Sequence, residues 1–173
     1  MPNRELARHF YTQYLNIVTL RDDTERGYTP EVAARAQEAT GRFVEDVTFD
    51  GAGTYRALMT EPSGWVNATL APYDGVANVK GDALQKVMLD PQQRGGLFTQ
   101  VSFLANAAHP TNTSPIQRAM IVLRRALCYD PPPPPPDIVI TPPEIVNGTF
   151  RDRLTAAAKD PGCRRYHQDG NPL

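Results

Sequence analysis

The sequence predicts an all-α fold, an irregular multi-helix bundle with a polyproline connector and a short C-terminal helix. Apolar residues recur at helical spacing along most of the 173 residues. Two segments begin with a Thr or Ser followed directly by proline, a pattern typical of a helix N-cap and first turn. Six consecutive prolines at 131–136 then interrupt the helical pattern.

The N-terminal part predicts four helices. Residues 4–20 carry apolar side chains at helical spacing, namely Leu6, Phe10, Tyr14 and Ile17. Thr29-Pro30-Glu31 predicts the start of a helix that runs to about residue 48. Its apolar face contains Val32, Ala36, Ala39, Phe43 and Val47. Glycines at 51 and 53 interrupt this helix, and shorter helices are expected at 54–60 and 64–71.

The middle of the chain predicts a loop followed by two helices. Residues 76–93 are expected to form a loop with a short turn at Ala83–Val87. From Arg94 a buried helix is expected, with Leu97, Val101, Leu104 and Ala108 on one face, widened by Phe98 and Phe103. Thr113-Ser114-Pro115 predicts the next helix. Its inward face would be Ile116, Met120, Leu123 and Leu127, opposite Arg118 and Arg125, and it must end before Pro131.

The proline run should form a stiff polyproline II rod, and residues 137–147 should stay extended. We favour a spacer on the domain surface; the alternative is a ligand for a proline-recognition module. One last helix is expected from Thr149 to about Lys159, packing Phe150, Leu154 and Ala157.

Composition excludes several classes of function. A net charge of −1 gives no electrostatic reason to bind nucleic acid or an anionic membrane. The longest aliphatic stretch, residues 119–123, is too short to be a transmembrane segment. Two cysteines and three scattered histidines give no closed zinc set. The chain also has no Gly-x-Ser-x-Gly elbow and no Walker-type phosphate loop.

The last eleven residues contain part of a haem-attachment motif. A c-type haem site needs two thiols three positions apart, followed directly by a histidine that becomes an axial ligand. Cys163 and His167 stand at the first and last of these positions, but Tyr166 occupies the position of the second thiol. Taken alone, a cysteine four residues before a histidine is also what a chance pair would give.

An ordered series of motifs surrounds this site. It consists of Arg94-Gly95-Gly96-Leu97 opening a helix, Thr113-Ser114-Pro115, the proline run, the Cys163–His167 segment and Asn171-Pro172-Leu173. This series resembles the planctomycete and myxobacterial secreted cytochrome-like proteins, in which a Cys-x-x-Cys-His motif follows the polyproline rod. Upstream, Thr40 to Gly75 resembles the helical domain that precedes it in that family.

The resemblance implies a haem-associated electron-transfer module of an exported bacterial multidomain protein, in the periplasm or outside the cell. It implies a partial N-terminal helical domain at 1–78 and a cytochrome-like helical domain at 79–173, in a protein that is longer at both ends. Haem c would be attached through Cys163, with His167 on the iron. Its partners would be a redox partner or other domains of the same protein. Because Tyr166 departs from the family pattern, a haem-less structural or interaction module is the alternative.

Several residues have two interpretations. His167 is an axial ligand or a polar residue at a terminus, and Cys163 forms a thioether or a disulfide with Cys128. A distal iron ligand would come from one of four side chains, namely His109, Met120, Met88 or Met59, although Met120 suits a gap-filling role in a core. Arg94-Gly95-Gly96 would bind an anion such as a haem propionate, or would let two helices approach closely, which we favour.

Overall fold

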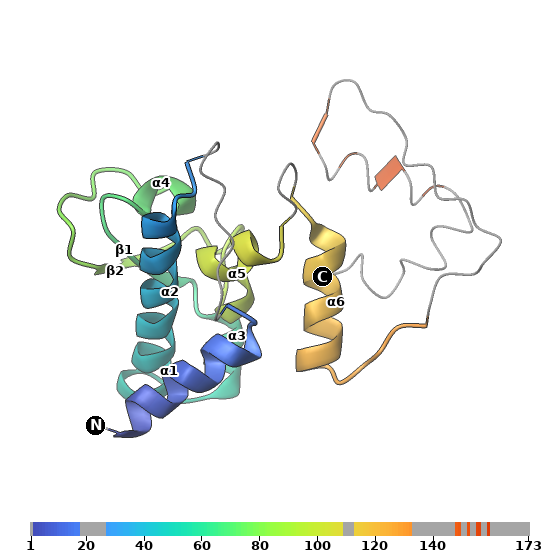
Figure 1. Cartoon of the computed structure of the whole chain (residues 1–173), viewed down its shortest axis with the longest axis horizontal. Coiled ribbons are helices and arrows are strands. Elements are labelled where there is room, and N and C mark those ends of the chain that lie inside the picture. The colour runs from blue at the N-terminus through green and yellow to red at the C-terminus, as the bar shows by residue number, and fades with distance from the viewer. Residues whose placement is uncertain are drawn as a thin grey trace. The chain divides into compact units, whose positions relative to one another are not determined.

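The computed structural model describes residues 2–17, 27–108 and 113–132, together with single positions between 148 and 159. The chain forms two compact units, Met1–Pro110 and Thr111–Leu173 (Figure 1). Among the described residues, the first unit contains most of the regular structure and the second contains one long helix. The expected domains at 1–78 and 79–173 stay a prediction.

The longest helix of the first unit is α2, Pro30–Glu45. Its N-cap is Thr29, whose hydroxyl oxygen accepts a hydrogen bond from the amide of Val32 at 3.3 Å, and Pro30 occupies the first turn. The apolar face predicted for this segment is confirmed, because all five of its members are buried: Val32, Ala36, Ala39, Phe43 and Val47. The local cap and the 3.6-residue period therefore determined this helix.

Helix α1, Pro2–Tyr14, crosses α2 near the C-terminal end of α2 (Figure 1). Helix α2 then continues directly into a short π-helix, η2, Asp46–Asp50. The next helix, α3, spans Tyr55–Thr60, and its N-cap Thr54 accepts a hydrogen bond from the amide of Ala57 at 3.1 Å. The helix predicted at 54–60 is thereby confirmed.

Two strands show that the predicted all-α class is wrong. Strand β1, Ser63–Val66, pairs antiparallel with β2, Gln85–Met88, and Gly64 lies opposite Val87. The helix expected at 64–71 is instead β1, a turn and the short helix α4, Ala71–Asp74. Similarly, the expected turn at Ala83–Val87 lies largely within β2. The unit is a mixed α/β structure.

Tertiary packing explains why the strand signal was missed. Ser63, Gly64 and Val66 are all buried, so β1 lacks the alternation of buried and exposed residues that marks a strand in a sequence. The close fit between strands involves Leu89, whose side chain would come within 3.0 Å of a Cβ placed at Gly64. The partner strand is nearly all exposed, and it forms because its backbone pairs with a segment some twenty residues earlier.

The single helix expected from Arg94 is also divided. A 3₁₀ turn, η3, spans Leu97–Thr99, and helix α5 spans Val101–Asn106. The break is at Gln100, whose backbone is extended with φ −65° and ψ 143°. The break changes which residues face inward: Leu97 and Phe103 are fully buried, whereas Val101 and Leu104 are only half-buried.

The core of the first unit lies between α2, the two strands, α4 and α5. Val66 of β1 and Leu70 pack against the apolar face of α2, together with Tyr28. Partly buried apolar side chains from the remaining elements complete it, namely Trp65, Tyr73, Val79, Leu84, Val87, Val101 and Ala105. Residues 94–108 thus contribute to the same core as α2.

In the second unit, helix α6 spans Pro115–Ala126, with proline in its first turn as predicted. Ser114 is its N-cap residue but makes no side-chain cap bond. The inward face is narrower than expected: Leu123 is buried and Met120 half-buried, but Ile116 and Leu127 are exposed. None of the helices that the structure describes is long and apolar enough to cross a membrane.

The last expected helix is described at a few positions only. Asp152, Thr155 and Ala156 are helical. The amide and hydroxyl of Thr149 donate to the Asp152 carboxylate at 2.7 and 2.8 Å, and the Asp152 amide donates back to the Thr149 hydroxyl at 3.2 Å. This reciprocal pattern is a capping box and supports a helix start at Thr149. The expected rod beyond Pro132 and the extended segment 137–147 lie outside the described residues.

Candidate functional site

The Arg94-Gly95-Gly96 turn joins the strand region to η3. The Gly95 amide donates to the Thr99 hydroxyl at 2.9 Å, and the Gly96 amide donates to the carbonyl of Glu61 at 2.9 Å. Both amides are therefore already hydrogen-bonded within the protein. An anion such as a haem propionate would have to break these bonds, so the anion-binding interpretation has no support here.

Gly96 lies against the last turn of α3. A Cβ placed on Gly96 would be 2.1 Å from the carbonyl carbon of Met59 and 2.7 Å from the carbonyl oxygen of Leu58. The backbone of Gly96 is also left-handed, with φ +69°. The favoured interpretation of the glycine pair, close approach to a helix, is confirmed for Gly96.

Arg94 ties this turn to α4. Its guanidinium donates to the carbonyl of Tyr73 at 2.8 Å and lies 3.5 Å from the carboxylate of Asp74. The Asp74 side chain is almost completely buried. Burial raises the pKa of the Asp74 carboxyl, and the nearby Arg94 charge offsets part of this rise. The ion pair therefore anchors the turn and keeps a titratable group inside the fold.

Asp74 makes the stability of the first unit depend on pH. Because the folded pKa is raised above its ordinary value of 3.8, the folded state binds more protons there than the unfolded state between these two values. The contribution of Asp74 to the free energy of unfolding is then greatest below the ordinary value and falls as the pH rises through the raised pKa. The Asp74→Asn variant lacks this group, so its free energy of unfolding does not fall in this way. We therefore expect the free energy of unfolding of the variant, minus that of the natural chain, to increase as the pH rises across this window. Urea titrations at a series of pH values measure the difference, and a flat or decreasing one would contradict the assignment.

The predicted haem residues Cys163, Tyr166 and His167 lie outside the described residues, as does Asn171-Pro172-Leu173. The other cysteine, Cys128, directly follows the C-cap residue of α6 and is exposed, with a left-handed backbone at φ +52°. The Cys128–Cys163 disulfide stays a prediction.

The candidate distal iron ligands belong to different units. Met59 is half-buried at the end of α3, and Met88 is 66% exposed on β2, both in the first unit. Met120 is half-buried on α6, in the unit that also includes the range of Cys163 and His167. His109 lies outside the described residues. Within the part of the chain that is described, no three His, Cys, Asp or Glu side chains gather to hold a metal ion.

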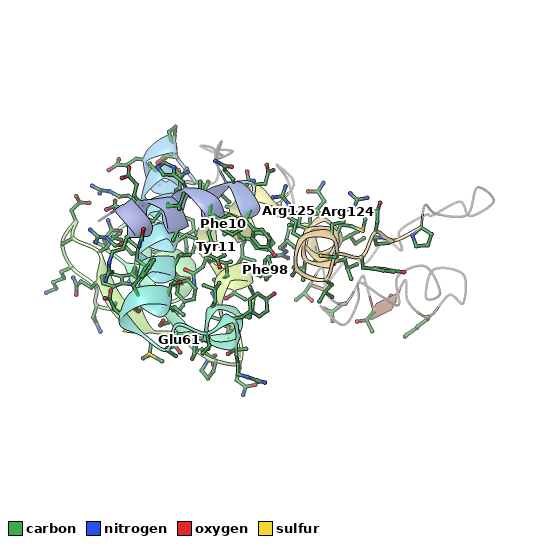
Figure 2. The ribbon with its side chains drawn as sticks, turned by 90° about the horizontal axis from the view of Figure 1, so that it is seen from below. Phe10, Tyr11, Glu61, Phe98, Arg124 and Arg125 are labelled. Carbon is green, nitrogen blue, oxygen red and sulfur yellow. The ribbon has the colours of Figure 1, made fainter. Side chains whose placement is uncertain are left out.

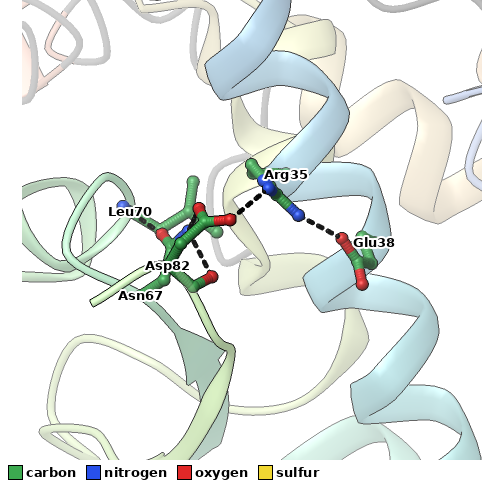
Figure 3. Close-up of polar contacts among 5 residues, drawn as sticks. All are labelled: Arg35, Glu38, Asn67, Leu70 and Asp82. Atoms are coloured by element: carbon green, nitrogen blue, oxygen red, sulfur yellow. Dashed lines mark hydrogen bonds and ion pairs between the residues drawn. The ribbon is translucent and has the colours of Figure 1, made fainter. Parts of the chain in front are cut away.

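Sequence reasoning missed a polar network centred on Asn67, which is completely buried (Figure 3). The Asn67 side chain accepts a hydrogen bond from the amide of Leu70 at 2.9 Å and donates to the carbonyl and carboxylate of Asp82 at 3.1 and 3.2 Å. Arg35 of α2 bridges the Asp82 and Glu38 carboxylates at 2.6 and 3.1 Å. The network fixes the 67–82 segment onto α2. Within the local sequence, this network is marked only by the turn in which the Asn67 side chain accepts the Leu70 amide.

Comparison with known proteins bears on the C-terminal part of the chain. Residues 94–173 match a family described as PSCyt3: Protein of unknown function (DUF1588). The match is consistent with the expected cytochrome-like domain of unknown function, and it begins at Arg94. No curated protein and no solved structure matches the chain.

The family match begins at residue 94, inside the first compact unit, and not at the boundary between the two units after residue 110. Gly96 contacts the end of α3, and the hydroxyl of Ser102 in α5 lies 2.6 Å from that of Thr40 in α2, in the buried interior. Residues 94–108 therefore fold with the preceding residues, although they match the same family as the C-terminal segment.

Proposed function

We propose that this chain is a haem-associated electron-transfer module of an exported bacterial multidomain protein. The family match carries the proposal, because the matched range includes Cys163 and His167 at the spacing of a haem-attachment motif. The ordered motifs before them support it. The periplasm or the extracellular space would be its location, and a redox partner or another domain of the same protein would exchange electrons with it.

The donor set fits a haem held by a single thioether. The Cys163 thiol would hold one vinyl group, and the imidazole of His167 would bind the iron. The phenol of Tyr166 cannot replace the second thiol, so the second vinyl group would stay free. When bound, the haem supplies a one-electron redox centre. The chain's own contribution would be to attach and orient it.

A haem-less structural or interaction module is the second candidate. Tyr166 favours it, because the substitution removes half of the covalent attachment. Under this candidate Cys163 is available to pair with Cys128.

Intact mass and the absorption spectrum distinguish the two candidates. We expect the chain, exported in cells with c-type haem maturation machinery, to gain the mass of one haem and to show a Soret band. Cys163→Ala should abolish the mass gain, and the matched control Cys128→Ala should retain it. An unmodified mass, or one lower by two hydrogens from a disulfide, would overturn the first candidate in favour of the second.

A further inference from the structure

Helix α1 lies on the surface of the first unit. Between residues 3 and 14, which the structure describes, every side chain is half-buried or exposed. Leu6 and Phe10, two members of the predicted apolar face, are 70% and 56% exposed. In α2, by contrast, half of the helix is buried. Burial of apolar side chains therefore holds α1 in place much less firmly than α2.

Two arginines of α1 contact the neighbouring helices. The Arg4 guanidinium donates to both oxygens of the Asp50 carboxylate at 2.6 Å and lies 5.2 Å from the centroid of the Phe49 ring, so it contacts η2 twice. One turn further along α1, the Nε atom of Arg8 lies 3.4 Å from the carboxylate of Glu45, at the end of α2. Residues four apart share one face of a helix. We call these two ion pairs, Arg4–Asp50 and Arg8–Glu45, the arginine clasps.

A glycine inside α2 leaves room for the second clasp. A Cβ placed on Gly41 would lie 2.8 Å from the Nε atom of Arg8 and 3.4 Å from its Cζ atom. Glycine destabilises a helix interior relative to alanine, and Gly41 stands well inside the 16-residue helix α2. The close approach of the Arg8 guanidinium to the α2 backbone gives a physical reason for glycine at this position.

The C-terminal end of α1 is held by burial. The amide of Ile17 donates to the carbonyl of Thr12 at 2.9 Å, and Asn16 has a left-handed backbone with φ +59°, which is the pattern of a Schellman motif. Leu15 and Ile17 are 0% and 1% exposed. The side chain of Gln37 in α2 donates to the carbonyl of Ile17 at 2.9 Å. This end of α1 is therefore anchored to the rest of the first unit.

An aromatic contact lies beside this anchor. Tyr14, the last residue of α1, meets Phe98 of η3 with ring centroids 6.3 Å apart. Figure 2 shows Phe10 and Tyr11 of α1 on the side of Phe98. The contacts of α1 thus change along its length, from partly exposed ion pairs at Arg4 and Arg8 to rings and buried aliphatic side chains at its end.

We propose that α1 is a latch, which detaches from α2 and η2 as one piece when the arginine clasps open. Leu15 and Ile17 then stay in place as the hinge, and the rest of the first unit remains folded. Closed, α1 covers the carboxylates of Glu45 and Asp50; open, it exposes them to solvent. Partly exposed ion pairs are weak and are screened by salt, so the ionic strength sets the fraction of open molecules.

Hydrogen exchange resolved by residue tests the latch. A helix of 13 residues is marginal by itself in water, so the amides of α1 exchange whenever it detaches. We expect the hydrogen-bonded amides of residues 6–14 to share one free energy of exchange, lower than that of the α2 amides. Raising the ionic strength from about 0.05 M to about 0.5 M should increase their rates about two-fold or more relative to α2.

Two outcomes of this measurement would overturn the proposal. Rates that fall gradually from residue 6 to residue 14 would mean that α1 frays from its N-terminus and does not detach as one piece. Rates equal to those of α2, at both ionic strengths, would mean that α1 opens only when the whole first unit unfolds.

Arg8→Gln and Arg42→Gln form a matched pair of variants. Both arginines lie near the Glu45 carboxylate, at 3.4 and 3.9 Å, but Arg42 belongs to α2 itself. Arg8→Gln should raise the ratio of α1 exchange to α2 exchange about two- to five-fold, the effect expected for one partly exposed ion pair. Arg42→Gln should leave this ratio unchanged. Equal effects of the two substitutions would contradict the role of the clasp.

Gly41→Ala separates the latch from the stability of α2. Alanine favours the helix, so the α2 amides should exchange more slowly than in the natural chain. The new Cβ displaces the Arg8 guanidinium, so the ratio of α1 exchange to α2 exchange should rise about as much as in Arg8→Gln. If exchange slows equally in both helices, the Arg8–Glu45 clasp does not hold α1, and the proposal fails.

Discussion

Replacing Gly96 by alanine is expected to lower the free energy of unfolding of the first unit by about 3 kcal/mol or more. The new Cβ would lie 2.1 Å from the carbonyl carbon of Met59 and 2.2 Å from its oxygen. Both are backbone atoms of α3, so no side-chain rotation relieves the clash. Urea unfolding followed by the fluorescence of Trp65, the one tryptophan of the chain, measures the loss.

Gly75→Ala is the matched control for this substitution. Gly75 has the same φ of +69°, but no atom lies within 4 Å of the position that a Cβ would take there, so only the backbone cost applies. We expect a loss of about 1 kcal/mol for this variant. Equal losses at Gly96 and Gly75 would show that close approach to α3 is not what requires glycine at Gly96.

The second large effect is expected from Phe103→Ala, at roughly 3 to 5 kcal/mol. Phe103 lies on α5, is 1% exposed and packs edge-on against Phe98 with ring centroids 5.3 Å apart. Removing its ring leaves a cavity between α5 and the rest of the first unit. Because Trp65 lies on β1, outside the family match, its fluorescence tests whether the matched residues 94–108 stabilise the residues before them.

Phe10→Ala serves as the control, since Phe10 is largely exposed on α1. Its removal should change the free energy of unfolding by less than about 1 kcal/mol. If Phe103→Ala leaves the unfolding transition of Trp65 unchanged, residues 94–108 fold independently of β1. The division of the chain into units 1–110 and 111–173 would then be wrong.

The helix starts were predictable because their signals are local. Thr29 and Thr54 cap α2 and α3 with bonds that reach only three residues ahead. The apolar face of α2 follows from its period alone. By contrast, the helix expected from Arg94 breaks at Gln100, whose side chain donates weakly to the carbonyls of Ser63 and Gly96 at 3.4 Å. The contact with Ser63 depends on β1, more than thirty residues away.

The candidate sites also differ in whether their residues are close together in the sequence. The spacing of Cys163 and His167, on which the proposed haem site rests, is a short local pattern and can be read from the sequence. The polar network around Asn67 cannot be read in this way, because Arg35, Asn67 and Asp82 come from three separate segments. Periodicity predicted one apolar face for residues 4–20, but the structure buries Ile17 of that face and leaves Leu6 and Phe10 70% and 56% exposed.

The sequence by itself determined the starts of α2 and α3, the buried face of α2, the proline run and the spacing of Cys163 and His167. Each of these is a relation among residues within a few turns of one another. Only the tertiary structure decided the pairing of β1 with β2, the contact of Gly96 with α3 and the exposure of Leu6 and Phe10 on α1. The reason is physical: a four-residue strand or a close backbone contact is stable only against a distant partner, so its local sequence need not specify it.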